Sequence, residues 1–121
     1  MNYQAIDVKE KLTRFSEHWS PKIIAQMNAY HFKIAKIQGE FVWHDHPETD
    51  EVFIILKGKL QIQFRNGSVT LNEGDMFVVP KEVEHKPVAE QECHIMLVES
   101  VGTLNTGDVV NDKTAPNDVW I

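Results

Sequence analysis

From Pro21 onward, the chain consists of short runs of strand-forming residues that turn residues interrupt at regular intervals. The clearest run is residues 59–71, where apolar and polar residues alternate on both sides of Asn66-Gly67, a dipeptide suited to a tight hairpin turn. Further runs of this kind occupy residues 51–56, 76–79 and 92–99. Because the runs are short and closely spaced, they favour a sandwich or barrel over alternating strands and helices. The sequence therefore predicts an all-β fold.

The 121 residues are enough to form one hydrophobic core, so we expect a single domain spanning residues 1–121. One short amphipathic helix is predicted near the N-terminus from a three- and four-residue spacing of Val8, Leu12, Phe15 and Trp19. The C-terminal segment from Asn105 is rich in turn formers but contains apolar side chains that could dock it on the barrel. These side chains are Val109, Val110, Val119, Trp120 and Ile121.

The charge and composition exclude several classes of function. A net charge of -6 with no cluster of Lys and Arg on one element argues against a nucleic-acid partner. The longest apolar run, residues 52–56, is far shorter than the roughly 20 residues of a membrane helix, and the N-terminus does not resemble a signal peptide. The single cysteine, Cys93, cannot form an intrachain disulfide and is expected to be a small buried side chain. We therefore expect a cytoplasmic protein without a membrane or nucleic-acid partner.

One group of residues carries the chemistry of a metal site. In His44-Asp45-His46 the two imidazoles would point together if the segment is an extended strand, because residues two apart share a face. Glu51 opens an apolar run, where a carboxylate is costly unless something neutralises it. Two neutral imidazoles and a carboxylate suit a divalent transition metal and leave positions open for water or substrate. His85, after a proline-ended turn, is the expected fourth ligand.

These residues resemble the motifs of the cupin superfamily. The first cupin motif contains His-x-His, a glutamate three or four residues later and a glycine after six more, as His44, His46, Glu51 and Gly58 do here. The second motif places a glycine, a proline and a histidine as Gly74, Pro80 and His85 are placed here. Two positions depart from the family pattern, since Glu82 replaces a usual glycine and Ala89 a frequent asparagine. Neither position is a metal ligand in the family, so the departures bear on loop geometry.

The resemblance implies a fold, a cofactor and a class of function. The chain looks like the small single-domain cupins described as mannose-6-phosphate-isomerase-like, which implies a double-stranded β-helix, or jelly-roll barrel, with a metal-binding core at about residues 31–100. The expected cofactor is one divalent transition metal: iron, manganese, nickel, copper or zinc. The family also suggests a homodimer, to which Ile23, Ile24 and Met27 could contribute a strand at a sheet edge.

Two functions remain open from the sequence. In the first, the metal and Glu51 act on a small polar substrate, either by isomerisation of a sugar phosphate or by dioxygenation of a metal-chelating compound, with Glu51 as a base. In the second, the chain is a non-catalytic module that binds a metal and a sugar or metabolite. Candidates for an apolar cavity lining, which core packing would explain equally well, are Phe53, Ile55, Met76 and Val78. Arg14 and Arg65, the only arginines, are not expected near the site.

Overall fold

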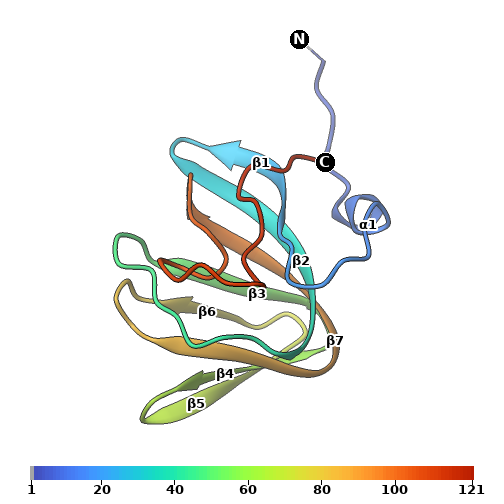
Figure 1. Cartoon of the computed structure of the whole chain (residues 1–121). Coiled ribbons are helices and arrows are strands. Elements are labelled where there is room, and N and C mark those ends of the chain that lie inside the picture. The colour runs from blue at the N-terminus through green and yellow to red at the C-terminus, as the bar shows by residue number, and fades with distance from the viewer. Residues whose placement is uncertain (1) are drawn as a thin grey trace.

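A computed structural model describes residues 2–121 and consists almost entirely of antiparallel strands (Figure 1). The elements are α1 (Val8–Leu12), β1 (Lys22–Met27), β2 (Tyr30–Glu40), β3 (Glu51–Lys57), β4 (Lys59–Phe64), β5 (Gly67–Asn72), β6 (Met76–Val79) and β7 (His85–Ser100). The strand order is β1-β2-β7-β3-β6, and the β4–β5 hairpin pairs with β7. This jelly-roll arrangement confirms the predicted all-β fold.

The 16-residue strand β7 joins the two parts of the barrel. Its first residues pair with β4, where Phe64 faces His85, and its later residues pair with β2 and β3 at once. Figure 1 shows β7 curving between the hairpin and the larger sheet. The hairpin turn itself is made by Arg65 and Asn66, one position before the predicted dipeptide, because Gly67 already pairs with Phe64.

The core lies between the inner faces of the strands, as period-two alternation requires. Phe53 and Ile55 of β3 are buried there with residues of β4 and β7. Met76 and Val78 are not, and the expectation that they line a cavity is wrong. They lie opposite Ile54 and Val52 on the outer face of the sheet, and about half of each side chain is exposed, 58% and 45% respectively.

The N-terminal helix is shorter than predicted. It begins after Asp7, whose side chain accepts a hydrogen bond of 3.1 Å from the Glu10 N–H, and it ends at Leu12. Phe15 lies beyond the helix but still packs in the small cluster that covers the outer face of β1 and β2. Trp19 has a φ of 59° and donates its backbone N–H to the Lys36 carbonyl at 2.9 Å, so pairing with β2 replaces the expected last turn.

The end of the chain docks along β1. The Ile23 N–H donates to the Val119 carbonyl at 2.7 Å, and the Ile121 N–H donates to the Ile23 carbonyl at 3.1 Å. Docking is therefore confirmed for the last residues, whereas Val109 and Val110 are exposed. Because Ile23 is covered in this way, strand addition at that edge of β1 would require the C-terminus to move, and the homodimer stays a prediction.

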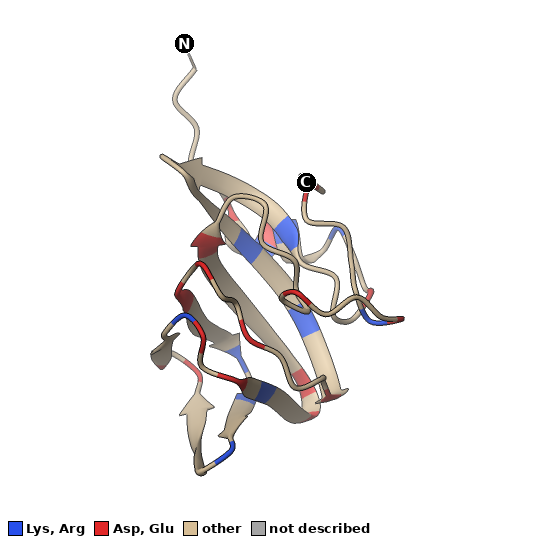
Figure 2. Ribbon diagram, turned by 60° about the vertical axis from the view of Figure 1, so that its left-hand side comes forward, with Lys and Arg blue, Asp and Glu red and all other residues tan. Residues whose placement is uncertain are grey.

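Positive and negative residues are mixed along the described chain, without a segment that is uniformly basic (Figure 2). The absence of a nucleic-acid partner stays a prediction. Among residues 2–121, no helix has the length and apolar character needed to span a membrane.

Replacing Glu82 by glycine should stabilise the fold. Glu82 has a φ of 69°, a left-handed conformation that costs a residue with a Cβ about 1–2 kcal/mol. Glycine avoids this strain, but its greater flexibility in the unfolded chain offsets part of the gain. We expect Glu82→Gly to raise the free energy of unfolding by about 1 kcal/mol in urea titrations of metal-free protein. Glu82→Ala keeps the strain and is the control. Equal stability of the glycine and alanine variants would contradict the prediction.

Candidate metal site

The structure brings His44, His46, Glu51 and His85 together. One potential ligand atom from each lies within 4.8 Å of the others, and all four residues are buried. His44 and His85 form an isolated antiparallel bridge, in which each backbone N–H donates to the other residue's carbonyl, at 3.0 and 2.9 Å. Glu51 is the first residue of β3 and points inward because Phe53 and Ile55 share its face.

The segment that carries His44 and His46 is not the predicted strand. Beyond the single bridge at His44 it is a loop, and the His46 carbonyl accepts a hydrogen bond from the Glu82 N–H at 2.9 Å instead of pairing in a sheet. Pro47, which follows, has no N–H to continue a ladder. The two imidazoles still lie close, with ring centroids 5.1 Å apart.

Two of the imidazoles are held in the same tautomer by the backbone. His44 Nδ1 lies 2.9 Å from the Val42 carbonyl oxygen, and His85 Nδ1 lies 2.9 Å from the Val83 carbonyl oxygen. A carbonyl only accepts, so each Nδ1 carries the proton and each Nε2 keeps its lone pair. Backbone carbonyls orient metal-binding histidines in this way in many proteins.

Two imidazole nitrogens lie close to the Glu51 carboxylate without satisfying it. Glu51 Oε1 lies 3.3 Å from His46 Nε2 and 3.4 Å from His85 Nε2, but neither contact has hydrogen-bond geometry. Within residues 2–121, no hydrogen-bond partner satisfies these three buried atoms. Unpaired buried polar atoms are costly, and a cation among them would pair all three at once. The residues present therefore fit a divalent metal ion.

The titration of the site follows from its burial. Burial and the neighbouring His85 lower the pKa of His44 to about 4, so its imidazole is neutral at physiological pH. Burial also acts to lower the pKa of His46, but the Glu51 carboxylate outweighs it and raises that pKa. Burial would raise the pKa of Glu51, but His46 and His85 lower it well below the ordinary value. The carboxylate is thus ionised and available to a metal.

A buried ion pair behind Glu51 is absent from the sequence prediction. Lys33 Nζ lies 3.0 Å from Glu99 Oε1, and both side chains are fully buried. Burial and the charge of Glu51 raise the pKa of Glu99. Glu99 ends the predicted run 92–99 and Lys33 has apolar neighbours, but neither pattern shows which face the side chain occupies. The pair places the Lys33 ammonium close to an otherwise acidic and histidine-rich site.

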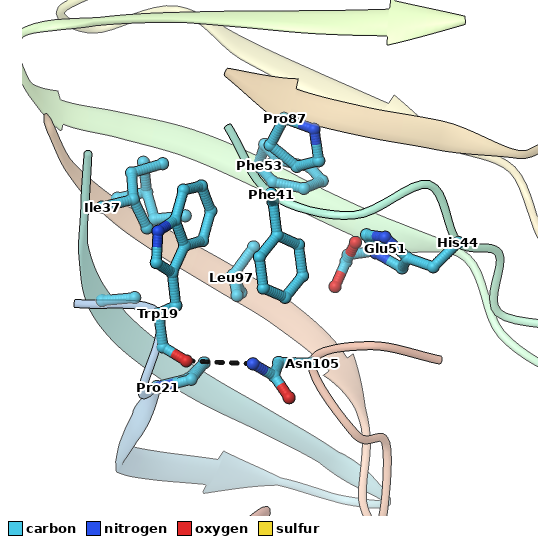
Figure 3. Close-up of a pocket in the computed structure, with 12 residues that line it drawn as sticks. Trp19, Pro21, Ile37, Phe41, His44, Glu51, Phe53, Pro87, Leu97 and Asn105 are labelled. Atoms are coloured by element: carbon cyan, nitrogen blue, oxygen red, sulfur yellow. Dashed lines mark hydrogen bonds between the residues drawn. The ribbon is translucent and has the colours of Figure 1, made fainter. Parts of the chain in front are cut away.

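A small cavity of about 30 Å³ lies beside the site and ends at His44 and Glu51. Its walls are mainly apolar, and the rings of Trp19 and Phe41 stack within it with centroids 4.5 Å apart. Figure 3 shows Phe41 and Leu97 between Trp19 and the Glu51 carboxylate. The predicted lining residue Phe53 is one of the walls, whereas Ile55 belongs to the core. Sequence reasoning missed Trp19 and Phe41, because they come from loops far apart in the chain.

Residues that the sequence placed outside the site lie outside it. The Arg65 guanidinium stacks 3.8 Å from the Trp43 ring centroid on the outer surface. His18 and His94 both contact Glu92, at 2.8 and 2.9 Å. His31 is buried against Trp120, and Cys93 is buried with a pKa raised to about 11 by that burial.

Comparison with known proteins decides the family. Residues 30–99 match the model of the cupin domain, Cupin_2. The chain is a member of the cupin family. A crystal structure of a cupin-2 domain protein from Shewanella frigidimarina is 55% identical, with a TM-score of 0.78, and the alignment covers 78% of this chain and 93% of that one.

Two further relatives are similar to this cupin. Protein NMB1881 from Neisseria meningitidis is 36% identical with a TM-score of 0.74 over 80% of this chain and 99% of that one. The uncharacterized protein YdbB of Bacillus subtilis is 36% identical over 68% of this chain and 67% of its own length. None of the three is described as an isomerase, and the likeness to mannose-6-phosphate isomerase stays a prediction.

Removing either histidine of the loop should remove bound metal. We expect purified wild-type protein, reloaded with cobalt(II) and desalted, to retain about one ion per chain, and His44→Ala and His46→Ala to retain far less. His94→Ala, which removes a histidine outside the site, is the control and should match the wild type. Elemental analysis gives the metal content. Equal content in all four proteins would overturn the assignment of the ligands.

Metal affinity should fall as the pH is lowered. Ligands bind unprotonated, and the raised pKa of His46 makes its proton the first to compete, whereas His44 stays neutral down to about pH 4. Below the pKa of His46, the dissociation constant for cobalt(II) should rise by about tenfold per pH unit. Titrations at about pH 8, 7 and 6 measure it. A constant affinity across that range would contradict this reading of the site.

Proposed function

We propose that this cupin binds one divalent transition metal through His44, His46, Glu51 and His85 and uses it to oxygenate a small organic substrate. The substrate would chelate the metal through oxygen atoms and place an apolar body in the adjoining cavity. The observation that carries the proposal is the cavity itself, which is apolar along its walls and reaches the metal ligands only at one end. The cavity is small, about 30 Å³, so a one-ring substrate would have to move the stacked rings of Trp19 and Phe41 apart to enter it.

The lining favours oxygenation over sugar-phosphate isomerisation. A phosphate needs cationic side chains or a row of backbone N–H groups, and among the described residues the cavity walls include neither Lys nor Arg. Asn105, a polar wall residue, already uses its amide, since its Nδ2 donates to the Trp19 and Lys113 carbonyls and its Oδ1 accepts from Ala115. A sugar would find few partners on these walls.

The metal, the aromatic rings and Glu51 would each have a different role in this reaction. When bound, the metal would act as a Lewis acid and would bring dioxygen and the chelating oxygens of the substrate together. The stacked rings of Trp19 and Phe41 would hold a flat substrate body and exclude water. Glu51 lies at the inner end of the cavity, where its carboxylate, once loosened from the metal, would accept the proton that a chelating hydroxyl loses. Glu51 is the catalytic residue in this account.

Oxygen uptake tests the proposed reaction. Iron(II)-loaded protein, prepared without oxygen, should consume dioxygen when mixed with one-ring catechols or β-diketones and should leave mannose 6-phosphate unchanged. Trp19→Ala should raise KM by about tenfold, because about 1.4 kcal/mol of ring contact is lost, with a smaller change in kcat. His94→Ala is the control. Interconversion of the sugar phosphate without oxygen uptake would overturn the oxygenase in favour of the isomerase.

The non-catalytic alternative predicts a different result from the same experiment. The four buried candidate ligands and the small apolar cavity suit retention of a ligand as well as its turnover. A binding module would show a change in the visible spectrum of the cobalt(II) protein on adding the catechol or the β-diketone, with no oxygen uptake by the iron(II) form.

A further inference from the structure

The loop that carries two ligands is in tight contact with the C-terminal segment. Gly107 lies against the backbone of Asp45, the residue between His44 and His46, and a Cβ at Gly107 would overlap the Asp45 carbonyl oxygen and lie 3.1 Å from its carbonyl carbon. Gly107 also has a φ of +67°, so both its conformation and the space around it require glycine. Backbone packs directly on backbone at this point.

The segment around Gly107 is fixed by its own hydrogen bonds. We call residues 103–115 the C-terminal strap. The Asn105 amide ties it to the Trp19 carbonyl at 2.9 Å and to its own far end at Lys113 and Ala115. Thr106 is fully buried, its hydroxyl donates to the Val109 carbonyl, and Lys113 Nζ donates to the Glu40 carbonyl at 2.8 Å.

The strap also reaches the polar group behind Glu51. The Thr103 carbonyl accepts a hydrogen bond of 3.1 Å from Lys33 Nζ, and that ammonium lies 3.0 Å from Glu99. One end of the strap is therefore hydrogen-bonded to Lys33 of the pair beside Glu51. Gly107, further along the strap, contacts the loop that carries His44 and His46. The strap lies outside residues 30–99, which match the cupin model.

We propose that the C-terminal strap positions the metal ligands, with Gly107 as the positioning residue that fixes Asp45 and, through it, the imidazoles of His44 and His46. The proposal rests on the proposed metal binding for its effect on affinity, but not for its effect on the loop. The loop has backbone hydrogen bonds at His44 and His46 but no regular strand pairing, and displacement of an orienting group typically costs about 10–100-fold in metal affinity. Contact with the strap restrains the position of the loop where strand pairing is absent.

The test compares two glycines of the same conformational class. Gly107→Ala strains a positive φ and pushes on Asp45, whereas Gly102→Ala strains a φ of +91° with nothing within 4 Å of the new Cβ. Cobalt(II) titration of EDTA-stripped proteins should give a dissociation constant about tenfold or more higher for Gly107→Ala, with a changed d–d absorption spectrum. Gly102→Ala should stay within about twofold of the wild type. Wild-type affinity and spectrum in Gly107→Ala would overturn the proposal.

Two further measurements test the proposal if Gly107→Ala does not fold or if the wild type binds no cobalt(II). If Gly107→Ala fails to fold by circular dichroism, Asn105→Ala loosens the strap without adding an atom and should raise the dissociation constant by about threefold or more. Unchanged affinity in that variant would count against the strap. If the wild type binds no cobalt(II), the proposed function fails, and the imidazole carbon–proton NMR signals decide the strap. The proposal is supported if the signals of His44 and His46 move in Gly107→Ala but not in Gly102→Ala. Where Gly107→Ala does not fold, Asn105→Ala takes its place in this comparison. Unmoved signals refute the proposal.

Discussion

The site depends on two reciprocal backbone hydrogen bonds between His44 and His85. They join a loop that follows β2 to the start of β7, although the two residues are 41 positions apart in the chain. Because the bonds are made by the backbone of the ligands themselves, the two imidazoles are placed side by side before any metal arrives, with ring centroids 4.3 Å apart. Carbonyls two residues upstream of each histidine then set the tautomer. Pre-organisation of this kind lowers the entropic cost of binding.

The cost of this arrangement is a concentration of polar groups inside an apolar barrel. Glu51 and Glu99 are both fully buried, and Lys33 supplies a compensating charge only to Glu99 directly. At the metal site of the described chain, the Nε2 atoms of His46 and His85 and Oε1 of Glu51 are without hydrogen bonds. A single divalent cation satisfies these groups together, whereas replacing one of them leaves the others unpaired. The apolar cavity adjoining them limits the access of water to these charges.

The sequence predicted the parts of this molecule that repeat or follow a spacing. Alternation in residues 59–71 and the hydrophobic runs were sufficient for the all-β fold, and the His-x-His, glutamate and distant histidine were sufficient to predict which four side chains come together as candidate ligands. It failed where tertiary contacts override local pattern. Trp19 continues a helical spacing but bends to pair with β2, and Met76 is apolar yet faces outward, since register and not hydropathy sets its face.

Other features had no local signal that could be read. Lys33 and Glu99 meet only because β2 and β7 are adjacent in the sheet, and nothing near either residue in sequence identifies the partner. Gly107 is one of several glycines in turn-rich segments, and its contact with Asp45 follows from the path of the C-terminal strap. Side-chain spacing within one segment predicts a face, but long-range pairing determines which faces meet.

The central claim is that three imidazoles and one carboxylate share a single cation. Anomalous scattering from a crystal of cobalt(II)-loaded protein tests it most directly. The account predicts one strong peak within about 2.0–2.2 Å of the Nε2 atoms of three histidines and an oxygen of Glu51. The histidines are His44, His46 and His85. A cobalt peak elsewhere on the chain, with these four side chains unligated, would contradict it.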